Sequence, residues 1–134
     1  MSTLAPTFVP GATATITHRV RPEDAADAWG NDLPVLSTPV LLWLSEIAAM
    51  KAVEDAIPDE FMTVGSAHDS AHLAPTLTGE EVTVRATLVE AGERSLLFEV
   101  EASDPRATIL SGRHRRGVVP REKFLTKLDA LRPR

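Results

Sequence analysis

The chain of 134 residues contains no cysteine, and this absence excludes several kinds of chemistry. Without cysteine there is no disulfide framework, no thiolate nucleophile and no cysteine-ligated zinc or iron–sulfur site. Tyrosine is absent as well, and only 4% of the residues are aromatic. We therefore expect any covalent step in catalysis by this chain to run through an oxygen atom.

Long apolar runs are also missing. The longest apolar stretch, Pro39 to Leu44, is far shorter than the ~20 residues that cross a bilayer. Residues 1–10 lack the basic start and apolar run of a secretory leader. The 43% apolar and 25% charged fractions are typical of a soluble globular protein. These features predict a cytoplasmic protein with no membrane attachment and a single domain over residues 1–134.

The charge is unevenly distributed. The net charge is −5, which argues against nucleic acid as a partner because such binding neutralises phosphates. Residues 1–110 hold 6 basic and 17 acidic side chains, whereas residues 111–134 hold 8 and 2. The basic end is either a solvated tail or a binding surface for an anionic ligand such as a phosphate-bearing cofactor or carrier.

The clearest predicted element is a helix that starts at Thr38 and Pro39 and ends before Pro58. Threonine is a good N-cap, and proline is favoured at the first helical position. The first three turns are apolar on almost every side. A helix with that pattern is buried on every side, so we expect it at the centre of the fold.

Most of the remaining chain predicts antiparallel strands, at residues 12–20, 61–74, 81–91, 94–103 and 107–119. A lid-like loop spans residues 21–37, and a terminal helix spans residues 121–131. This order indicates an α+β protein with a long central helix wrapped by a five-stranded antiparallel sheet, the arrangement called the hotdog fold. An open sheet leaves an edge strand, so we expect a homodimer that continues the sheet.

Few residues could carry chemistry. Glu46 lies two turns into the apolar helix, where an unpaired carboxylate would be costly, and this points to a site.

His68 and His72 share one polar face of the strand at 61–74, but about 13 Å of extended chain separates them, too far to share one metal ion. We expect no metal site. Thr38 and Glu46 are separated by about 12 Å of helical rise, so a site containing both takes them from different subunits or uses them on different parts of the ligand.

Three motifs resemble the fluoroacetyl-CoA-thioesterase-type hotdog thioesterases. A threonine precedes the helix glutamate by eight residues, as Thr38 precedes Glu46. A glycine precedes a histidine by seven, as Gly65 precedes His72, and an arginine closes an S-G-x-H-x-R stretch, as Arg116 does. The likeness extends over residues 35–125 and includes the spacing between the motifs.

The resemblance implies that Thr38, Glu46 and His72 are the catalytic set, and that Gly65 and Arg116 position the acyl thioester and its carrier. It also implies a homodimer with active sites at the subunit interface, and no cofactor beyond the CoA of the substrate. An acyl-carrier thioester is an equally open substrate. Arg113 is a candidate for the CoA phosphates, and Trp43 is a candidate for shaping the acyl pocket.

One feature of the family is missing. The family's founding member has an aromatic lid residue a few positions before the threonine, where this chain reads Asn31-Asp32-Leu33-Pro34. Specificity for fluoroacetyl-CoA is therefore not expected here.

The residue types suit thioester hydrolysis, which needs an attacking group, a proton shuttle and oxyanion donors. Glu46 would act as nucleophile or as base toward water, His72 would carry a proton to the leaving thiolate, and Thr38 would orient the attacking group.

Two alternatives to a thioester hydrolase remain open. A hydratase should show a D-x-N-x-x-H pattern, but Asp69 and His72 lack the asparagine between them. The other is a non-catalytic protein that binds acyl-CoA or a small apolar ligand.

Overall fold

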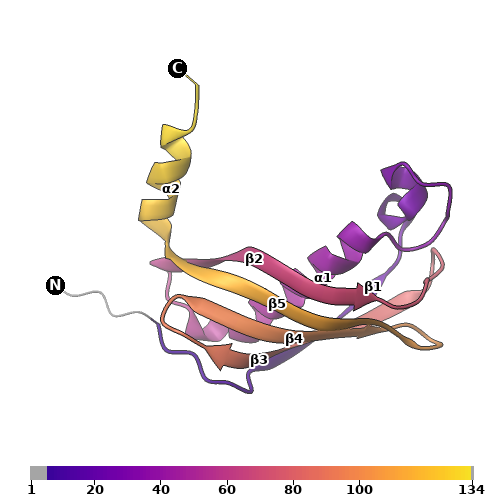
Figure 1. The fold of residues 1–134 in the computed structure, drawn as a ribbon, viewed down its shortest axis with the longest axis horizontal. Coiled ribbons are helices and arrows are strands. Elements are labelled where there is room, and N and C mark those ends of the chain that lie inside the picture. Colours follow the sequence, from indigo (N-terminus) through magenta and orange to yellow (C-terminus); the bar gives the residue numbers. More distant parts are fainter. Residues whose placement is uncertain (1–5, 134) are drawn as a thin grey trace.

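The computed structural model describes residues 6–133 and has one antiparallel sheet of five strands. The sheet order is β1-β3-β4-β5-β2, with one long helix, α1, packed against the sheet (Figure 1). The predicted α+β class and five strands are confirmed. In chain order the elements are β1 (Thr13–Arg19), the 3₁₀ helices η1 (Pro22–Asp24) and η2 (Ala26–Trp29), α1 (Thr38–Val53), η3 (Glu54–Ala56), β2 (Phe61–His72), β3 (Glu81–Ala91), β4 (Ser95–Ser103), β5 (Thr108–Pro120) and α2 (Arg121–Ala130).

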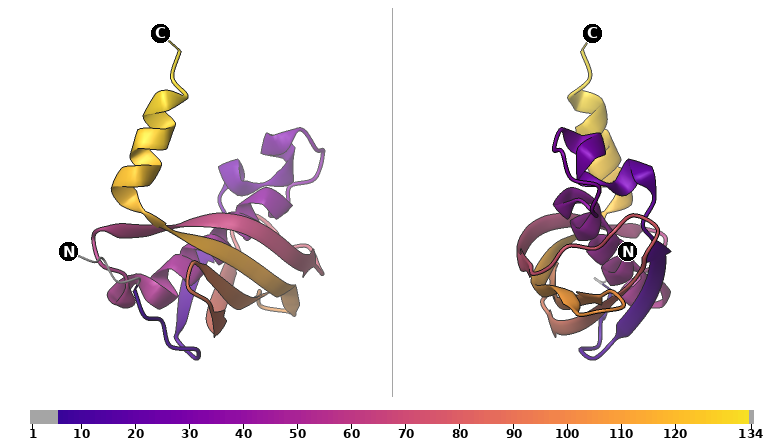
Figure 2. Two further views of the ribbon diagram at one scale, coloured as in Figure 1. Left: turned by 60° about the vertical axis from the view of Figure 1, so that its left-hand side comes forward. Right: turned by 90° about the vertical axis from the view of Figure 1, so that its right-hand side faces the viewer.

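The core lies between the concave face of the sheet and α1. Alternate residues of β3 and β4 are buried, because successive side chains on a strand point to opposite faces. The sheet curves around the helix, which is clear when the molecule is seen end-on (Figure 2). α1 packs most closely on β3 and β1, which leaves its other side near β2 less covered. The site described below lies on that side.

The start and end of α1 differ from the sequence-based prediction. Thr38 is the first helical residue and Ser37 is the N-cap, so the prediction of Thr38 as N-cap was wrong. The backbone oxygen of Ser37 accepts the first helical bond, from the N–H of Leu41. The helix ends at Val53 and tightens into η3, because Pro58 disfavours helical conformation in the residue before it. As a result the Thr38 hydroxyl is available for a contact outside the helix.

The prediction that α1 is buried on every side was also wrong for the single chain. Trp43 is 53% exposed, and Ile47 and Met50 are only partly buried. The physical reason is that one curved sheet covers one side of a helix. The uncovered side of α1 is therefore apolar and available to a ligand or a second chain.

β2 is an end strand of the sheet, and within residues 6–133 it pairs only with β5. Its register shifts between Gly65 and Ala67. At the other end of the chain, α2 stands clear of the sheet, and its residues are exposed except for the partly buried Phe124 (Figure 1). Within residues 6–133, no helix is both long and apolar enough to span a bilayer.

Candidate active site

The first group of reactive side chains joins the start of α1 to the end of β2. The Oγ1 atom of Thr38 lies 2.7 Å from Nδ1 of His72, although the two residues are 34 positions apart in the chain. Burial lowers the pKa of His72, and a backbone hydrogen bond at Ala74 only partly offsets this. At neutral pH the His72 imidazole is therefore uncharged and able to accept a proton.

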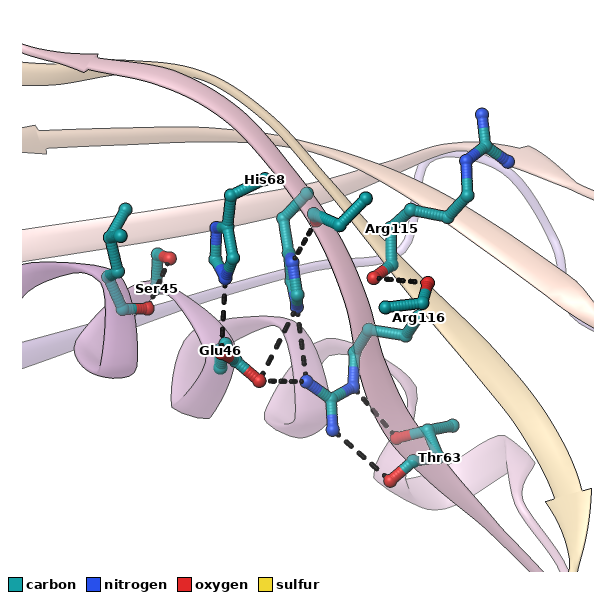
Figure 3. A network of polar contacts seen from close by, with 10 residues as sticks. Ser45, Glu46, Thr63, His68, Arg115 and Arg116 are labelled. Atoms are coloured by element: carbon teal, nitrogen blue, oxygen red, sulfur yellow. Dashed lines mark hydrogen bonds and ion pairs between the residues drawn. The ribbon is translucent and has the colours of Figure 1, made fainter. Parts of the chain in front are cut away.

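The second group surrounds Glu46, and we call Glu46, His68, His114 and Arg116 the Glu46 cluster (Figure 3). Arg116 donates from Nη1 to Oε1 of the carboxylate at 2.8 Å. His68 contacts Oε2 through its Nε2 at 3.0 Å. Each carboxylate oxygen therefore has its own donor, one from β5 and one from β2.

The hydrogen-bond donors around Glu46 determine the charge of its carboxyl group. Burial by itself raises the pKa of the Glu46 carboxyl, but the hydrogen bonds from His68 and Arg116 outweigh it, so the pKa lies below its usual value. The charge of Arg116 adds to this effect. Glu46 is therefore ionised at neutral pH, as a nucleophile or a base must be.

Arg116 is itself fixed inside the protein, with only 3% of its surface exposed. Besides Glu46, its guanidinium donates to the Thr63 hydroxyl at 3.0 Å and to the Thr63 carbonyl at 3.1 Å. It also lies 3.1 Å from Nε2 of His114. Because guanidinium only donates, this His114 nitrogen accepts and carries no hydrogen.

The other nitrogen of the His114 ring fits the same assignment. Nδ1 donates to the backbone oxygen of Ala67 at 2.9 Å, which places the single hydrogen of the ring there. Burial is the main cause that lowers the pKa of His114, and this favours the uncharged ring. His114 is thus a neutral part of the cluster, with no hydrogen facing Glu46.

Gly65 gives the Glu46 carboxylate its space. A Cβ atom at position 65 would overlap Oε1 of Glu46. No ordinary side chain fits without displacing the carboxylate. Gly65, which the resemblance assigns to positioning the acyl thioester, therefore lies against the predicted catalytic carboxylate.

The structure brings some of the predicted site residues together and separates others. Thr38 contacts His72, whereas Glu46 contacts Arg116 and lies against Gly65. Arg113 is exposed and, by strand alternation, points to the opposite face of β5 from buried Arg116. Trp43 lies on the uncovered side of α1, away from the core.

Two members of the Glu46 cluster were not among the predicted site residues. The sequence placed His68 on the polar face of its strand but did not link it to Glu46. The strand alternation was a usable signal for facing direction. It could not give the pairing of β2 with β5 that sets His68 opposite His114.

A carboxylate and two imidazoles also form a possible metal-ligand set. The ligand atoms of Glu46, His68 and His114 lie within 4.8 Å of one another. However, Nη1 of Arg116 lies 2.8 Å from the carboxylate and 3.1 Å from the His114 nitrogen. This guanidinium supplies the positive charge that a metal ion would bring, so the residues fit an ion poorly.

Several buried polar atoms near these groups have no hydrogen-bond partner among residues 6–133. They are Nδ1 of His68, Oγ of Ser70, Nε2 of His72 and Oγ of Ser37. Three lie on alternate residues of β2, on the face directed toward α1, and the fourth precedes Thr38. Such atoms are rare in native proteins and call for an explanation. These four atoms lie together between the start of α1 and β2, beside the contact of Thr38 with His72.

Comparisons with known proteins identify the family of the chain. Residues 20–122 match the family described as fluoroacetyl-CoA-specific thioesterase. The chain is 33% identical over 99 residues to a fluoroacetyl-CoA thioesterase of Streptantibioticus cattleyicolor, and the match covers 74% of this chain and 71% of that protein.

Solved structures give the same result. The fluoroacetyl-CoA thioesterase FlK superposes with a TM-score of 0.88 at 28% identity, over 95% of this chain and 99% of that one. A threonine-to-serine variant of FlK in complex with acetyl-CoA gives 0.88 at 27% identity, over 94% and 100%. A thioesterase superfamily member from Thermus thermophilus gives 0.85 at 25% identity, over 92% of each chain. The hotdog fold is confirmed, and the chain belongs to the fluoroacetyl-CoA-specific thioesterase family of thioester hydrolases.

Proposed function

We propose that this protein hydrolyses an acyl-CoA thioester to a carboxylic acid and free CoA. The observation that carries the proposal is the hydrogen bond between Thr38 and His72, which sets a hydroxyl against an uncharged imidazole. An ionised carboxylate in the same chain, Glu46, supplies the third reactive group. The Streptantibioticus cattleyicolor relative and FlK are fluoroacetyl-CoA thioesterases, and a FlK variant was solved with acetyl-CoA.

In the proposed mechanism, a water oxygen attacks the thioester carbonyl carbon while Glu46 takes one of the water protons. Glu46 passes this proton to the uncharged imidazole of His72. The C–S bond then breaks with its electron pair going to sulfur, and the protonated His72 delivers the proton to the thiolate. Thr38 orients the reacting groups through its bond to His72. One water is consumed, and one acid and one thiol are released.

We propose further that each active site is built from two chains. Thr38 and Glu46 lie eight residues apart on one helix, about 12 Å of rise, and in one chain they contact different partners. A second chain could supply the missing half. The end strand β2 and the uncovered apolar side of α1 with Trp43 are suited to such a homodimer, because both leave groups unpaired or exposed.

The remaining assignments follow from this arrangement. Arg116 acts on the substrate through Glu46 rather than by binding CoA phosphates, because it is buried and its donors are engaged. Arg113 is exposed and remains the candidate for those phosphates. Trp43 contributes to the acyl pocket or to the dimer contact beside it.

We propose that no cofactor is needed beyond the CoA of the substrate and that the protein acts in the cytoplasm.

A thiol-release assay tests the proposal. Acetyl-, fluoroacetyl-, propionyl-, isobutyryl- and benzoyl-CoA are offered to the wild type, with Glu46→Gln and His72→Ala as matched variants. We expect release with at least one substrate, and a fall in kcat of more than about 10² in each variant, the usual size of a general acid–base effect. Binding without release would indicate a ligand-binding protein, and a change in enoyl absorbance with enoyl-CoA would indicate a hydratase. Either result would overturn the proposal.

A further inference from the structure

His68 is the member of the Glu46 cluster that neither the proposed mechanism nor the predicted catalytic set uses. It lies on β2, four residues before His72, and contacts Glu46 across 22 positions of sequence. Both its side chain and that of Glu46 are largely shielded, with 22% and 21% exposed. Because both side chains are shielded from solvent, the fold holds His68 and Glu46 in contact.

We propose that His68 is a positioning residue for Glu46, which holds the carboxylate oxygen Oε2 in the orientation needed for reaction. The inference rests on the proposed function in one respect, that it takes Glu46 as a reacting group. It assigns to Glu46 two supports of different kinds, Arg116 on Oε1 and His68 on Oε2.

The two supports of the Glu46 carboxylate are not equivalent. Arg116 is permanently charged, buried and tied to Thr63 by two further bonds, so its contact with Oε1 is fixed. His68 makes a single hydrogen bond through its side chain within residues 6–133, the one to Oε2. Oε2 is therefore the carboxylate oxygen whose position depends on one imidazole.

His68 and His114 differ in how they contact Glu46. His114 also faces Glu46, but its Nε2 is 3.9 Å away and accepts a hydrogen from Arg116. The single hydrogen of the His114 ring lies on Nδ1, toward Ala67. Of the two imidazoles near Glu46, His68 is thus the one that donates to the carboxylate.

His68 is itself held in place. Its ring stacks on the His114 ring with centroids 4.1 Å apart and planes 15° from parallel. His114 is completely buried and bonded at both nitrogens, so it forms a rigid base for the His68 ring. Figure 3 shows Glu46 below the His68 ring and beside the Arg116 guanidinium. The aim of Nε2 toward Oε2 is therefore set by packing as well as by the hydrogen bond.

The charged and titratable groups within ion-pairing distance of Glu46 are His68 from β2 and His114 and Arg116 from β5. The hydrogen bond from His68 lowers the pKa of Glu46, and so does the one from Arg116. Removal of the His68 donor should therefore raise the pKa of Glu46. A residue that only filled space would leave that pKa unchanged.

The test compares His68→Leu, which removes the donor, with His68→Gln, whose amide N–H can still reach the carboxylate. Asp69→Asn is the control, because Asp69 is the next residue and is exposed on the other face of β2. For each protein, kcat and KM are measured as a function of pH. The Glu46 carboxyl is titrated by NMR with carbon-13 in the glutamate side chains, its signal being identified by its loss in Glu46→Gln.

We expect His68→Leu to lower kcat by about tenfold to a hundredfold with little change in KM, since a hydrogen bond to a charged group is lost. The Glu46 signal and the acid limb of kcat should both move to higher pH. His68→Gln should restore most of both, and Asp69→Asn should match the wild type.

An unshifted Glu46 titration in His68→Leu would overturn the inference, and so would a failure of His68→Gln to restore the titration in a folded variant. Activity lost to a chelator and regained with zinc would also overturn it, in favour of a metal site at Glu46, His68 and His114. A wild type that hydrolyses no acyl-CoA would overturn the proposed function instead, and the NMR titration would still decide the role of His68.

Discussion

Gly65 lies so close to Glu46 that a single carbon added at position 65 would overlap Oε1 of the carboxylate. The glycine comes from β2 and the glutamate from α1, so this contact fixes how near the edge strand approaches the helix.

Gly65→Ala should displace the Glu46 carboxylate from its contact with Arg116. A misplacement of about 1 Å in a reacting group costs up to about 10² in rate, and overpacking costs about 1–3 kcal/mol of stability. We expect kcat to fall by about that factor and the melting temperature to drop, as measured by thiol release and thermal unfolding. Gly117→Ala is the matched control, because its nearest contact, Val64, is at an ordinary 3.8 Å. Equal behaviour of the two variants would contradict the prediction.

A site shared between two chains predicts complementation. Thr38→Val and Glu46→Gln should each be inactive as homodimers. In a mixed dimer, one site would carry both changes and the other would carry neither. Random mixing makes half of the dimers mixed, so about a quarter of wild-type activity should return.

The control for complementation is the pair Thr38→Val and His72→Ala. These two residues contact each other within one chain, so a mixed dimer of this pair has a defect in both sites. No activity should return. Recovery in the control, or none in the first mixture despite mixed dimers seen by mass, would argue that Thr38 and Glu46 act in one chain.

Both oxygens of Glu46 have a hydrogen-bond donor, Arg116 for Oε1 and His68 for Oε2. Such a carboxylate is better suited to deprotonate water than to attack a carbonyl carbon itself. After many turnovers in water enriched in oxygen-18, we expect the label in the product acid and none in the peptide that contains Glu46, as measured by mass spectrometry. Label in that peptide would instead indicate an anhydride with the enzyme. Protein incubated without substrate is the control.

The stability of the fold should decrease as the solution becomes acidic, in two stages. The pKa values of His72 and His114 are lowered, mainly by burial, so below the ordinary histidine value of about 6.5 the unfolded chain binds more protons than the folded one. Stability is therefore present above that pH and is lost as the pH falls through the folded pKa values. Glu46, whose pKa lies below its usual value, adds a second loss under about pH 4.5.

Urea unfolding at a series of pH values measures both stages. His72→Gln should reduce the slope of the free energy of unfolding between about pH 6.5 and pH 5.5, since one titrating group is removed. Glu46→Gln should leave that slope in place and reduce the loss at lower pH. An unfolding free energy that is flat from pH 7 to pH 5 would contradict the assignment of lowered histidine pKa values.

The sequence by itself determined the elements and the reactive residue types. Alternation of apolar residues predicted the strands at residues 81–91 and 94–103 to within one residue of β3 and β4, because alternation is a local consequence of the pleat. One carboxylate in an apolar helix was enough to make Glu46 a candidate site residue. The spacing of Thr38, Gly65, His72 and Arg116 was enough to indicate the family.

Only the tertiary structure decided which of these residues meet. The contact of Thr38 with His72, and of Glu46 with His68, Arg116 and Gly65, depends on α1 lying against β2 and on the register of β2 with β5. These are long-range choices, made by packing a curved sheet over one side of a helix, and no local pattern encodes them. The same packing left Trp43 exposed where the helix pattern predicted burial, because one sheet cannot surround a helix that is apolar on every side.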